Sequence, residues 1–96
     1  MAGRHKTRAI AFISSAHDGR ASEARLRLSE RYQGVSPDAA DVIVALGGDG
    51  FMLQTLHAFL NTGKPIYGMN CGTVGFLMNE YEEERLPERI ERAAVN

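Results

Sequence analysis

The stretch that decides the fold is DVIVALGGDGFMLQTLHAFL, residues 41–60. Residues 42–46 (VIVAL) are apolar throughout, which is typical of a strand buried on both faces in a parallel sheet. After this run, apolar side chains recur at helical spacing: Phe51, Met52, Leu56, Phe59 and Leu60. The sequence NTG at residues 61–63 predicts the end of that helix, with Gly63 as its C-terminal cap.

Strand and helix patterns alternate along the rest of the chain. Residues 9–14 (AIAFIS) and 65–70 (PIYGMN) are short apolar runs that predict two further strands. From Ser22, the sequence SEARLRLSERY predicts a helix with a serine cap, although its alternating leucines also fit a strand. Residues 79–96 predict a charged final helix with Pro87 in its first turn, since a proline in mid-helix costs ~3 kcal/mol.

These three strand–helix pairs predict the fold class α/β. We expect a small, mostly parallel sheet flanked by helices in three layers, a Rossmann-like nucleotide-binding half with right-handed crossovers. At 96 residues the chain forms one small domain, which buries roughly 60–70% of its unfolded surface. Nothing in the last residues, AAVN, closes a fold, so we expect residues 1–96 to be the leading part of a longer protein.

The amino-acid composition and net charge limit the kinds of molecule that the protein is expected to bind. A hydrophobic content of 44% and a charged content of 24% are typical of a soluble globular protein. The net charge of -1, with both signs mixed, favours neither nucleic acid nor an anionic membrane as a partner. No apolar run approaches the ~20 residues of a membrane span. The single cysteine, Cys71, excludes an internal disulfide and predicts a cytoplasmic location.

A carboxylate stands between glycines directly after the apolar run 42–46, in the order Gly47-Gly48-Asp49-Gly50. Open α/β sheets bind ligands at the carboxyl ends of their strands. Glycines there lack the Cβ atoms that would keep a phosphate or ribose from the backbone, and a following helix N-terminus attracts anions. The alternative is that Asp49 only caps the helix, which is worth ~1 kcal/mol. We favour ligand chemistry, because capping alone does not need three surrounding glycines.

A second glycine-bearing stretch, GMNCGTVGFL at residues 68–77, follows the strand predicted at 65–70. It is neither a Walker loop nor G-x-G-x-x-G, because the required lysine and glycine spacing are missing. The carboxyl ends of parallel strands meet at one edge of a sheet. The two motifs together therefore predict a nucleotide-sized cleft at that edge.

Gly-Gly-Asp-Gly followed by Gly-x-Asn-x-Gly-x-x-Gly-Phe-Leu resembles the NAD kinase family, and the resemblance covers residues 42–80 closely. That family transfers the terminal phosphoryl of ATP, or of polyphosphate in some members, to the 2′-hydroxyl of the adenosine ribose of NAD, giving NADP. The resemblance implies that residues 1–96 are the amino-terminal α/β domain of an NAD kinase. The β-rich carboxy-terminal domain of the family, which supplies most dinucleotide contacts, is absent from this chain.

The resemblance also implies partners. NAD and ATP are the expected substrates, ATP comes with Mg²⁺ or another divalent cation, and the full-length protein is expected to be a homo-oligomer. Nucleic acid and membrane are not expected partners. Because the second domain is missing, we expect the 96-residue chain alone to have little or no kinase activity.

In the first motif, Asp49 matches the family's proton acceptor for the ribose 2′-hydroxyl, and Gly50 matches its neighbour in NAD binding. Gly47 and Gly48 would give the phosphate chain room. Many members carry a basic residue five positions after the aspartate, and this chain has Gln54 there. That departure puts in doubt a direct cationic contact from this helix.

In the second motif, Asn70, Gly72 and Gly75 match the family's nucleotide-binding loop. Phe76 resembles the apolar wall near the adenine. Cys71 lies between these positions, and we interpret it as a small buried thiol.

Two alternatives remain at this stage. Gly-Gly-Asp-Gly alone also occurs in diacylglycerol and sphingosine kinases and in phosphofructokinases, so one alternative is the catalytic lobe of a lipid kinase. The second motif of lipid kinases usually resembles Gly-Thr-x-Asn-Asp, from which Asn70-Cys71-Gly72 departs. The other alternative is a non-catalytic nucleotide-binding module.

The remaining titratable residues predict no metal site. His5 and His17 have no partner at metal-ligand spacing, so we interpret them as surface residues. His57 is interpreted as a half-exposed helix histidine, and the alternative is that it substitutes for the basic residue replaced by Gln54. Residues 80–85 (EYEEER) predict a solvated face. The family's Asn-Glu pair belongs to its second domain, so it is not assigned to residues 79–80.

Overall fold

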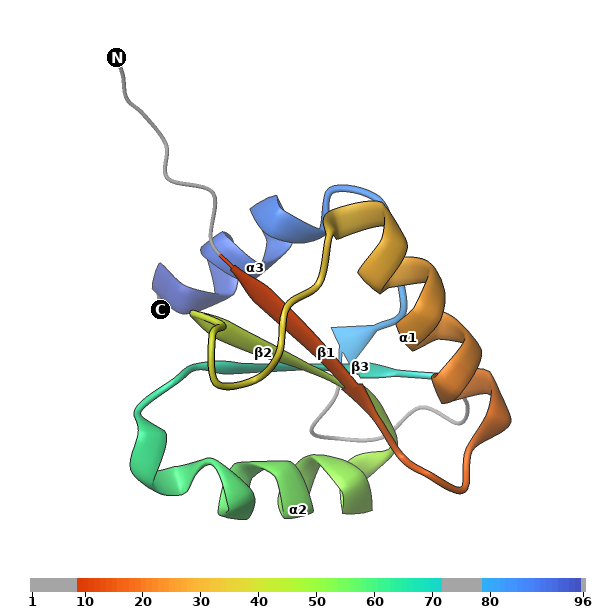
Figure 1. The fold of residues 1–96 in the computed structure, drawn as a ribbon, viewed down its shortest axis with the longest axis horizontal. Helices are drawn as coiled ribbons and strands as arrows, with labels where there is room; N and C mark the ends of the chain where they lie inside the picture. The colour runs from red at the N-terminus through yellow and green to blue at the C-terminus, as the bar shows by residue number, and fades with distance from the viewer. Residues whose placement is uncertain (1–8, 72–78, 96) are drawn as a thin grey trace.

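The structure, a computed structural model, describes residues 9–71 and 79–95 (Figure 1). Its elements are β1 (Ile10–Ser14), α1 (Gly19–Tyr32), β2 (Val42–Gly47), α2 (Asp49–Ala58), the 3-10 turn η1 (Leu60–Thr62), β3 (Ile66–Asn70), β4 (Asn79–Glu80) and α3 (Leu86–Val95). The strands form one sheet in the order β1-β2-β3-β4, and every neighbouring pair is parallel. Helices α1 and α3 cover one face of the sheet and α2 covers the other (Figure 1). The predicted three-layer α/β fold is confirmed.

The strands alternate their side chains between two apolar layers. One cluster lies under α1 and α3 and takes alternate residues from the strands: Ile10, Phe12, Val42, Val44, Leu46, Tyr67 and Met69. On the opposite face, Ala11 and Ile43 form a second cluster, against which Phe59 of the α2 side packs. Because helices cover both faces, all six residues of β2 are buried. This is why VIVAL carries no polar residue.

The two crossovers differ in hand. Both step in the same direction across the sheet, from β1 to β2 and from β2 to β3. Their helices α1 and α2 lie on opposite faces (Figure 1). Equal steps with helices on opposite faces give opposite hands, so the right-handed rule holds for only one of the two units.

Helix α1 begins four residues earlier than a cap at Ser22 predicts. Its N-terminal cap is Asp18, whose Oδ1 accepts the backbone N–H groups of Arg20 and Ala21 at 3.1 and 3.2 Å. Ser22 lies inside the first turn, because its own N–H already bonds to the carbonyl of Asp18 at 3.0 Å. The segment is a helix and not a strand, and Leu28 is its innermost leucine with no exposed surface.

The final segment is helical from Leu86 onward, and residues 79–85, which the sequence pattern assigns to the same helical segment, are not helical. Residues Asn79–Glu80 pair with β3 as the short strand β4. Arg85 then adopts a left-handed backbone with φ of 59°, which no continuous helix allows. Pro87 lies in the first turn of α3, as predicted. Gly63 is a left-handed cap with φ of 72°, also as predicted, but it caps η1 and not α2 itself.

Candidate functional site

The two glycine motifs leave the sheet from neighbouring strands. Gly47, the last residue of β2, is in register with Asn70, the last residue of β3. The backbone N–H of Cys71 donates to the carbonyl of Gly47 at 3.3 Å, which extends the pairing by one residue. For the described residues, the prediction that both motifs start at one edge is confirmed. The predicted site residues Gly72, Gly75 and Phe76 lie outside the described residues.

Asp49 is the first residue of α2, and it is half-buried. The cap position belongs to Gly48, whose extended backbone has φ of -117° and ψ of -173°. The N–H of Met52 closes the first turn on the carbonyl of Gly48 at 3.0 Å. Asp49 is therefore not the capping residue, which corrects the capping interpretation. Its carboxylate lies in the first turn, where the helix dipole stabilises negative charge.

The glycines around Asp49 serve different purposes. A Cβ on Gly47 would lie 3.2 Å from both Cβ and Cδ2 of Phe51, and Gly47 has a positive φ of 158°, so both the packing against α2 and the backbone favour glycine there. Gly48 and Gly50 have no such neighbour: no atom of the described residues lies within 4 Å of a Cβ built on either one. Neither has a positive φ. Among the described residues, the space beside these two glycines is thus open, and no positive φ explains a glycine at either position.

Asn70 brings a polar side chain to the same edge from β3. It is 9% exposed, at the end of a strand whose preceding residues are also buried. Together with Asp49 it gives this edge one carboxylate and one carboxamide. This pair can accept and donate hydrogen bonds to a ligand that carries hydroxyl groups.

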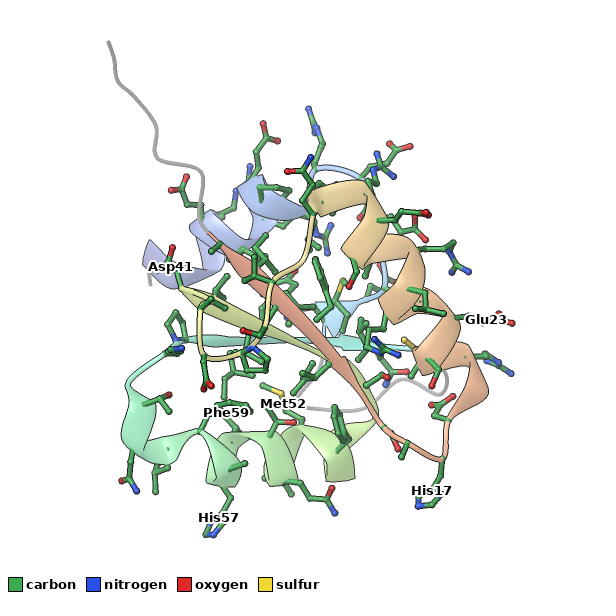
Figure 2. All side chains as sticks on the ribbon, in the orientation of Figure 1. His17, Glu23, Asp41, Met52, His57 and Phe59 are labelled. Carbon is green, nitrogen blue, oxygen red and sulfur yellow. The ribbon has the colours of Figure 1, made fainter. Side chains whose placement is uncertain are left out.

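The other side chains of α2 divide into an inner and an outer set. Met52 and Phe59 point toward the sheet, whereas His57 points away from it (Figure 2). Gln54 and His57 are both exposed, so His57 is more accessible than the half-exposed position predicted for it. His17 is also exposed as predicted, and His5 lies outside the described residues.

The part of the chain that the structure describes has neither a candidate metal site nor a membrane-spanning helix. Residues 9–71 and 79–95 contain no group of three or more His, Cys, Asp or Glu side chains arranged to hold a metal ion. Within the same ranges no helix combines the length and the apolar character that crossing a membrane requires.

Sequence reasoning missed two arginines of α1 near this edge. Arg20 donates from Nη1 to the carbonyl of Cys71 at 3.3 Å. Arg27 donates from Nε to Glu83 at 2.9 Å, and the hydroxyl of Tyr81 bonds to the same carboxylate at 2.5 Å. The prediction of a solvated face is wrong for Tyr81 and Glu83, which are half-buried against α1. Their contacts join residues more than 50 positions apart, which no local pattern reveals.

Cys71 links the edge to the core. Its side chain is half-buried and packs against the cluster under α1 and α3. Burial raises the pKa of the Cys71 thiol above its usual value, Asp18 raises it further, and the nearby Arg27 and Arg20 oppose this rise. The thiol is therefore predominantly protonated at neutral pH, as expected for a structural cysteine.

Comparisons with known proteins agree with this geometry. The family model described as ATP-NAD kinase N-terminal domain matches residues 2–94. A protein named NAD kinase from Brucella suis biovar 1 (strain 1330) is 61% identical over 82 residues, which cover 85% of this chain and 32% of that protein. Another NAD kinase, from Caulobacter vibrioides (strain ATCC 19089 / CIP 103742 / CB 15), is 61% identical over 79 residues, which cover 79% of this chain and 30% of that protein.

The NAD kinase of Rhizobium meliloti (strain 1021) is 55% identical over 91 residues, covering 95% of this chain and 35% of that protein. This chain thus spans about a third of the length of the curated relatives it matches. No solved structure gives a significant match. The family model covers nearly the whole chain, and each of these relatives is more than half identical to it over the matched residues. The chain belongs to the NAD kinase family and carries its ATP-NAD kinase N-terminal domain.

Proposed function

We propose that the protein is an NAD kinase, which transfers the terminal phosphoryl of ATP, or of polyphosphate, to the 2′-hydroxyl of the adenosine ribose of NAD. The observation that carries this proposal is the position of Asp49. It is a half-buried carboxylate at the exit of the central strand β2, between two glycines that leave open space beside it. The names of the relatives support NAD and ATP as substrates and do not favour a lipid kinase.

In the proposed reaction Asp49 accepts the proton of the ribose 2′-hydroxyl. The hydroxyl oxygen bonds to the γ-phosphorus, the bond from that phosphorus to the β–γ bridging oxygen breaks, and ADP leaves. A positioned carboxylate of this kind contributes ~10²–10⁴-fold to the rate. Phosphoryl transfer has a loose transition state, so positioning matters more than the strength of the base. The rigid β2 exit supplies that positioning.

The proposed binding residues surround this carboxylate. Gly48 and Gly50 leave room for the ribose and the phosphate chain, and the first turn of α2 offers backbone N–H groups to an anion. Gly47 packs on Phe51 and so keeps the loop close to α2. Asn70 would donate to the nucleotide from β3.

The second motif and the divalent cation complete the proposal. The resemblance assigns Gly72, Gly75 and Phe76 to nucleotide binding, and these stay predictions. Mg²⁺ or another divalent cation would arrive with ATP as part of the substrate. Mg²⁺ in such sites keeps several waters and binds mainly through the substrate phosphates, and no residue of this chain is assigned to it.

The test is Asp49→Asn in the full-length protein, assayed for NADP formation from NAD and ATP-Mg²⁺. We expect the rate to fall ~10²–10⁴-fold while the fold is retained, because asparagine keeps the shape and loses the proton acceptor. Asp38→Asn is the matched control, since Asp38 is an exposed aspartate in the linker before β2. The control should keep the wild-type rate.

Each other outcome contradicts the proposal in a different way. An unchanged rate in Asp49→Asn would refute the catalytic assignment. Phosphorylation of diacylglycerol but not of NAD by the wild type would favour the lipid kinase alternative. Binding of NAD without any turnover would favour a non-catalytic nucleotide-binding module.

The 96-residue chain alone should form little or no NADP, because it corresponds to about a third of its relatives. Robust NADP formation by this chain would contradict that expectation. We further propose a homo-oligomer for the full-length protein. The free thiol of Cys71 is consistent with the proposed cytoplasmic location.

A further inference from the structure

Helix α1 reaches the residue that follows Asn70 in the chain. The guanidinium of Arg20 donates from Nη1 to the carbonyl of Cys71 at 3.3 Å. The N–H of the same residue is bonded to Gly47, and its side chain packs on the core. Cys71 is therefore held at its N–H, at its carbonyl and through its side chain. The bond to the carbonyl comes from α1, and the cluster on which the side chain packs also contains α1 residues.

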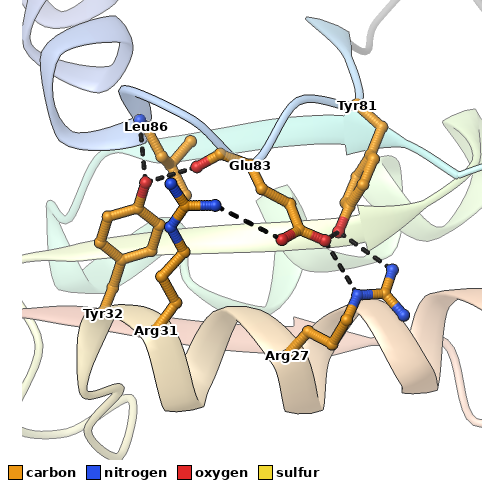
Figure 3. Close-up of polar contacts among 6 residues, drawn as sticks. All are labelled: Arg27, Arg31, Tyr32, Tyr81, Glu83 and Leu86. Carbon is orange, nitrogen blue, oxygen red and sulfur yellow. Dashed lines mark hydrogen bonds and ion pairs between the residues drawn. The ribbon is translucent and has the colours of Figure 1, made fainter.

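The same helix also contacts the segment that follows β4, the strand that pairs with β3 beside Asn70. Arg27 donates to the carboxylate of Glu83 at 2.9 Å, and its Nη2 lies 3.4 Å from the hydroxyl of Tyr81 (Figure 3). The hydroxyl of Tyr81 bonds to Glu83 at 2.5 Å, which closes a triangle of three side chains. Arg31 adds a longer ion pair with Glu83 at 3.7 Å. This triangle anchors the segment that directly follows β4.

Both contacts converge on Asn70. Cys71 follows Asn70 in the chain, and Glu80, which precedes Tyr81, is in register with Asn70 across the β3–β4 pair. Arg20 and Arg27 are seven positions apart, which is about two helical turns and places them on one face of α1. One helix thus contacts the residue that follows Asn70 in the chain and the segment that follows its cross-strand partner Glu80.

We propose that Arg20 and Arg27 are positioning residues, through which α1 holds Asn70 in place for the nucleotide that binds beside Asp49. The inference rests on the proposed function, because it assigns Asn70 to substrate binding. Neither arginine needs to contact the substrate. Their effect on the reaction passes through Cys71 and through the Tyr81–Glu83 segment.

The test uses the full-length protein with the variants Arg20→Ala, Arg20→Lys, Arg27→Ala and Arg27→Lys. NADP formation is measured over a range of NAD concentrations to separate KM from kcat, and the thermal midpoint is recorded for each variant. Arg92→Ala is the control, because Arg92 is an exposed arginine in the last turn of α3 and its loss changes the net charge equally.

We expect Arg20→Ala to raise KM for NAD about three- to tenfold, the effect of losing one charge-assisted hydrogen bond, with kcat within about twofold of wild type. Arg20→Lys should restore most of the affinity, since an ammonium can donate to the same carbonyl. Arg27→Ala should raise KM and also lower the thermal midpoint, because it leaves Glu83 and Tyr81 without their shared donor. Arg27→Lys keeps a cation for Glu83 and should recover the thermal midpoint.

The outcomes separate this inference from the proposed function. An active wild type whose Arg20→Ala variant keeps its KM overturns the inference alone, as does a lower thermal midpoint with no change in KM. A KM that rises as much in Arg92→Ala as in Arg20→Ala also overturns it, because charge alone would then explain the effect. A wild type that forms no NADP overturns the proposed function and this inference together.

Discussion

Gly47 and Asn70 lie opposite each other in register at the ends of β2 and β3, one residue before the two motifs diverge from the sheet. The carbonyl of Gly47 also accepts the N–H of Cys71 at 3.3 Å. The carboxylate of one motif and the carboxamide of the other are therefore carried by backbones bonded to each other. A ligand held by both would be positioned by sheet geometry and not by a long loop.

Substitutions at two glycines of the first motif should have different effects on stability and on NAD binding. Gly48→Ala places its Cβ in open space and has an allowed backbone, so the free energy of unfolding should change by less than about 0.5 kcal/mol. Its KM for NAD should nevertheless rise, if a nucleotide occupies that space. Gly47→Ala is the contrasting variant and should destabilise by about 1–3 kcal/mol, because its Cβ would lie 3.2 Å from Phe51. Urea unfolding and NAD titration measure the two effects. Equal stability losses in both variants would contradict this division.

The stability of the core under α1 should depend strongly on the side chain of Leu28. This side chain is fully buried between α1 and the sheet, so Leu28→Ala should lower the free energy of unfolding by about 2–5 kcal/mol. Leu26→Ala is the matched control on the same helix, since Leu26 is 60% exposed and should change stability by less than about 0.5 kcal/mol. Urea denaturation of both variants is the measurement. Similar losses of unfolding free energy in the two variants would contradict the packing of α1 through Leu28.

The contacts of Glu83 predict a pH dependence at the acid end. The hydroxyl of Tyr81 and the guanidinium of Arg27 hold the pKa of Glu83 below its usual value of 4.5. A carboxyl whose pKa is lower in the folded state stabilises the fold above its unfolded-state pKa. That stabilisation is lost as the pH falls from about 4.5 through the folded-state pKa.

Glu83→Gln should therefore be less stable than wild type at pH 7 and should lose less further stability on acidification below pH 4.5. Glu84→Gln is the control, because Glu84 is an exposed neighbour of the same charge. Unfolding by urea at several pH values compares the three proteins. A Glu83→Gln variant with the full wild-type acid dependence would exclude this carboxyl as its source.

The thiol of Cys71 should react slowly with alkylating reagents in the folded protein. Because burial raises its pKa, the thiolate fraction at pH 8 should be smaller in the folded protein than in urea. Alkylation by iodoacetamide should accordingly be slower in the native state, and its rate should keep rising above pH 9.0. Mass spectrometry over time gives both rates. A native thiol that reacts as fast as the unfolded one would contradict the burial of this side chain.

Apolar patterns predicted those strands and helices in which several buried residues form a regular pattern. The run VIVAL identified β2 because both faces of that strand are covered. The apolar spacing identified α2 through Met52, although Leu56 and Leu60 of the same predicted stripe are 39% and 70% exposed. The same reasoning misplaced the start of α1, since a serine and an aspartate can both cap a helix and only the packing selects Asp18. It also missed β4, which has two exposed residues and therefore no apolar signal.

The candidate site also contains some residues that sequence patterns reveal and others that they do not. The identities of Asp49 and Asn70 follow from short motifs after predicted strands, so the sequence was sufficient to name them. The arginines that support the site were not recognisable, because Arg27 and Glu83 are 56 positions apart and meet only after folding. Long-range polar contacts leave no periodic trace in a single sequence.

The burial of β2 on both faces limits which substitutions this strand can accept. Asp49 begins the helix that follows a strand locked into two apolar layers, so a shift of that strand displaces the carboxylate as well. Substitutions at Ile43 or Val44, which face opposite layers, should then alter turnover and stability together. An evolutionary search for a more stable variant would find little freedom in this strand and more on the outer surfaces of the helices.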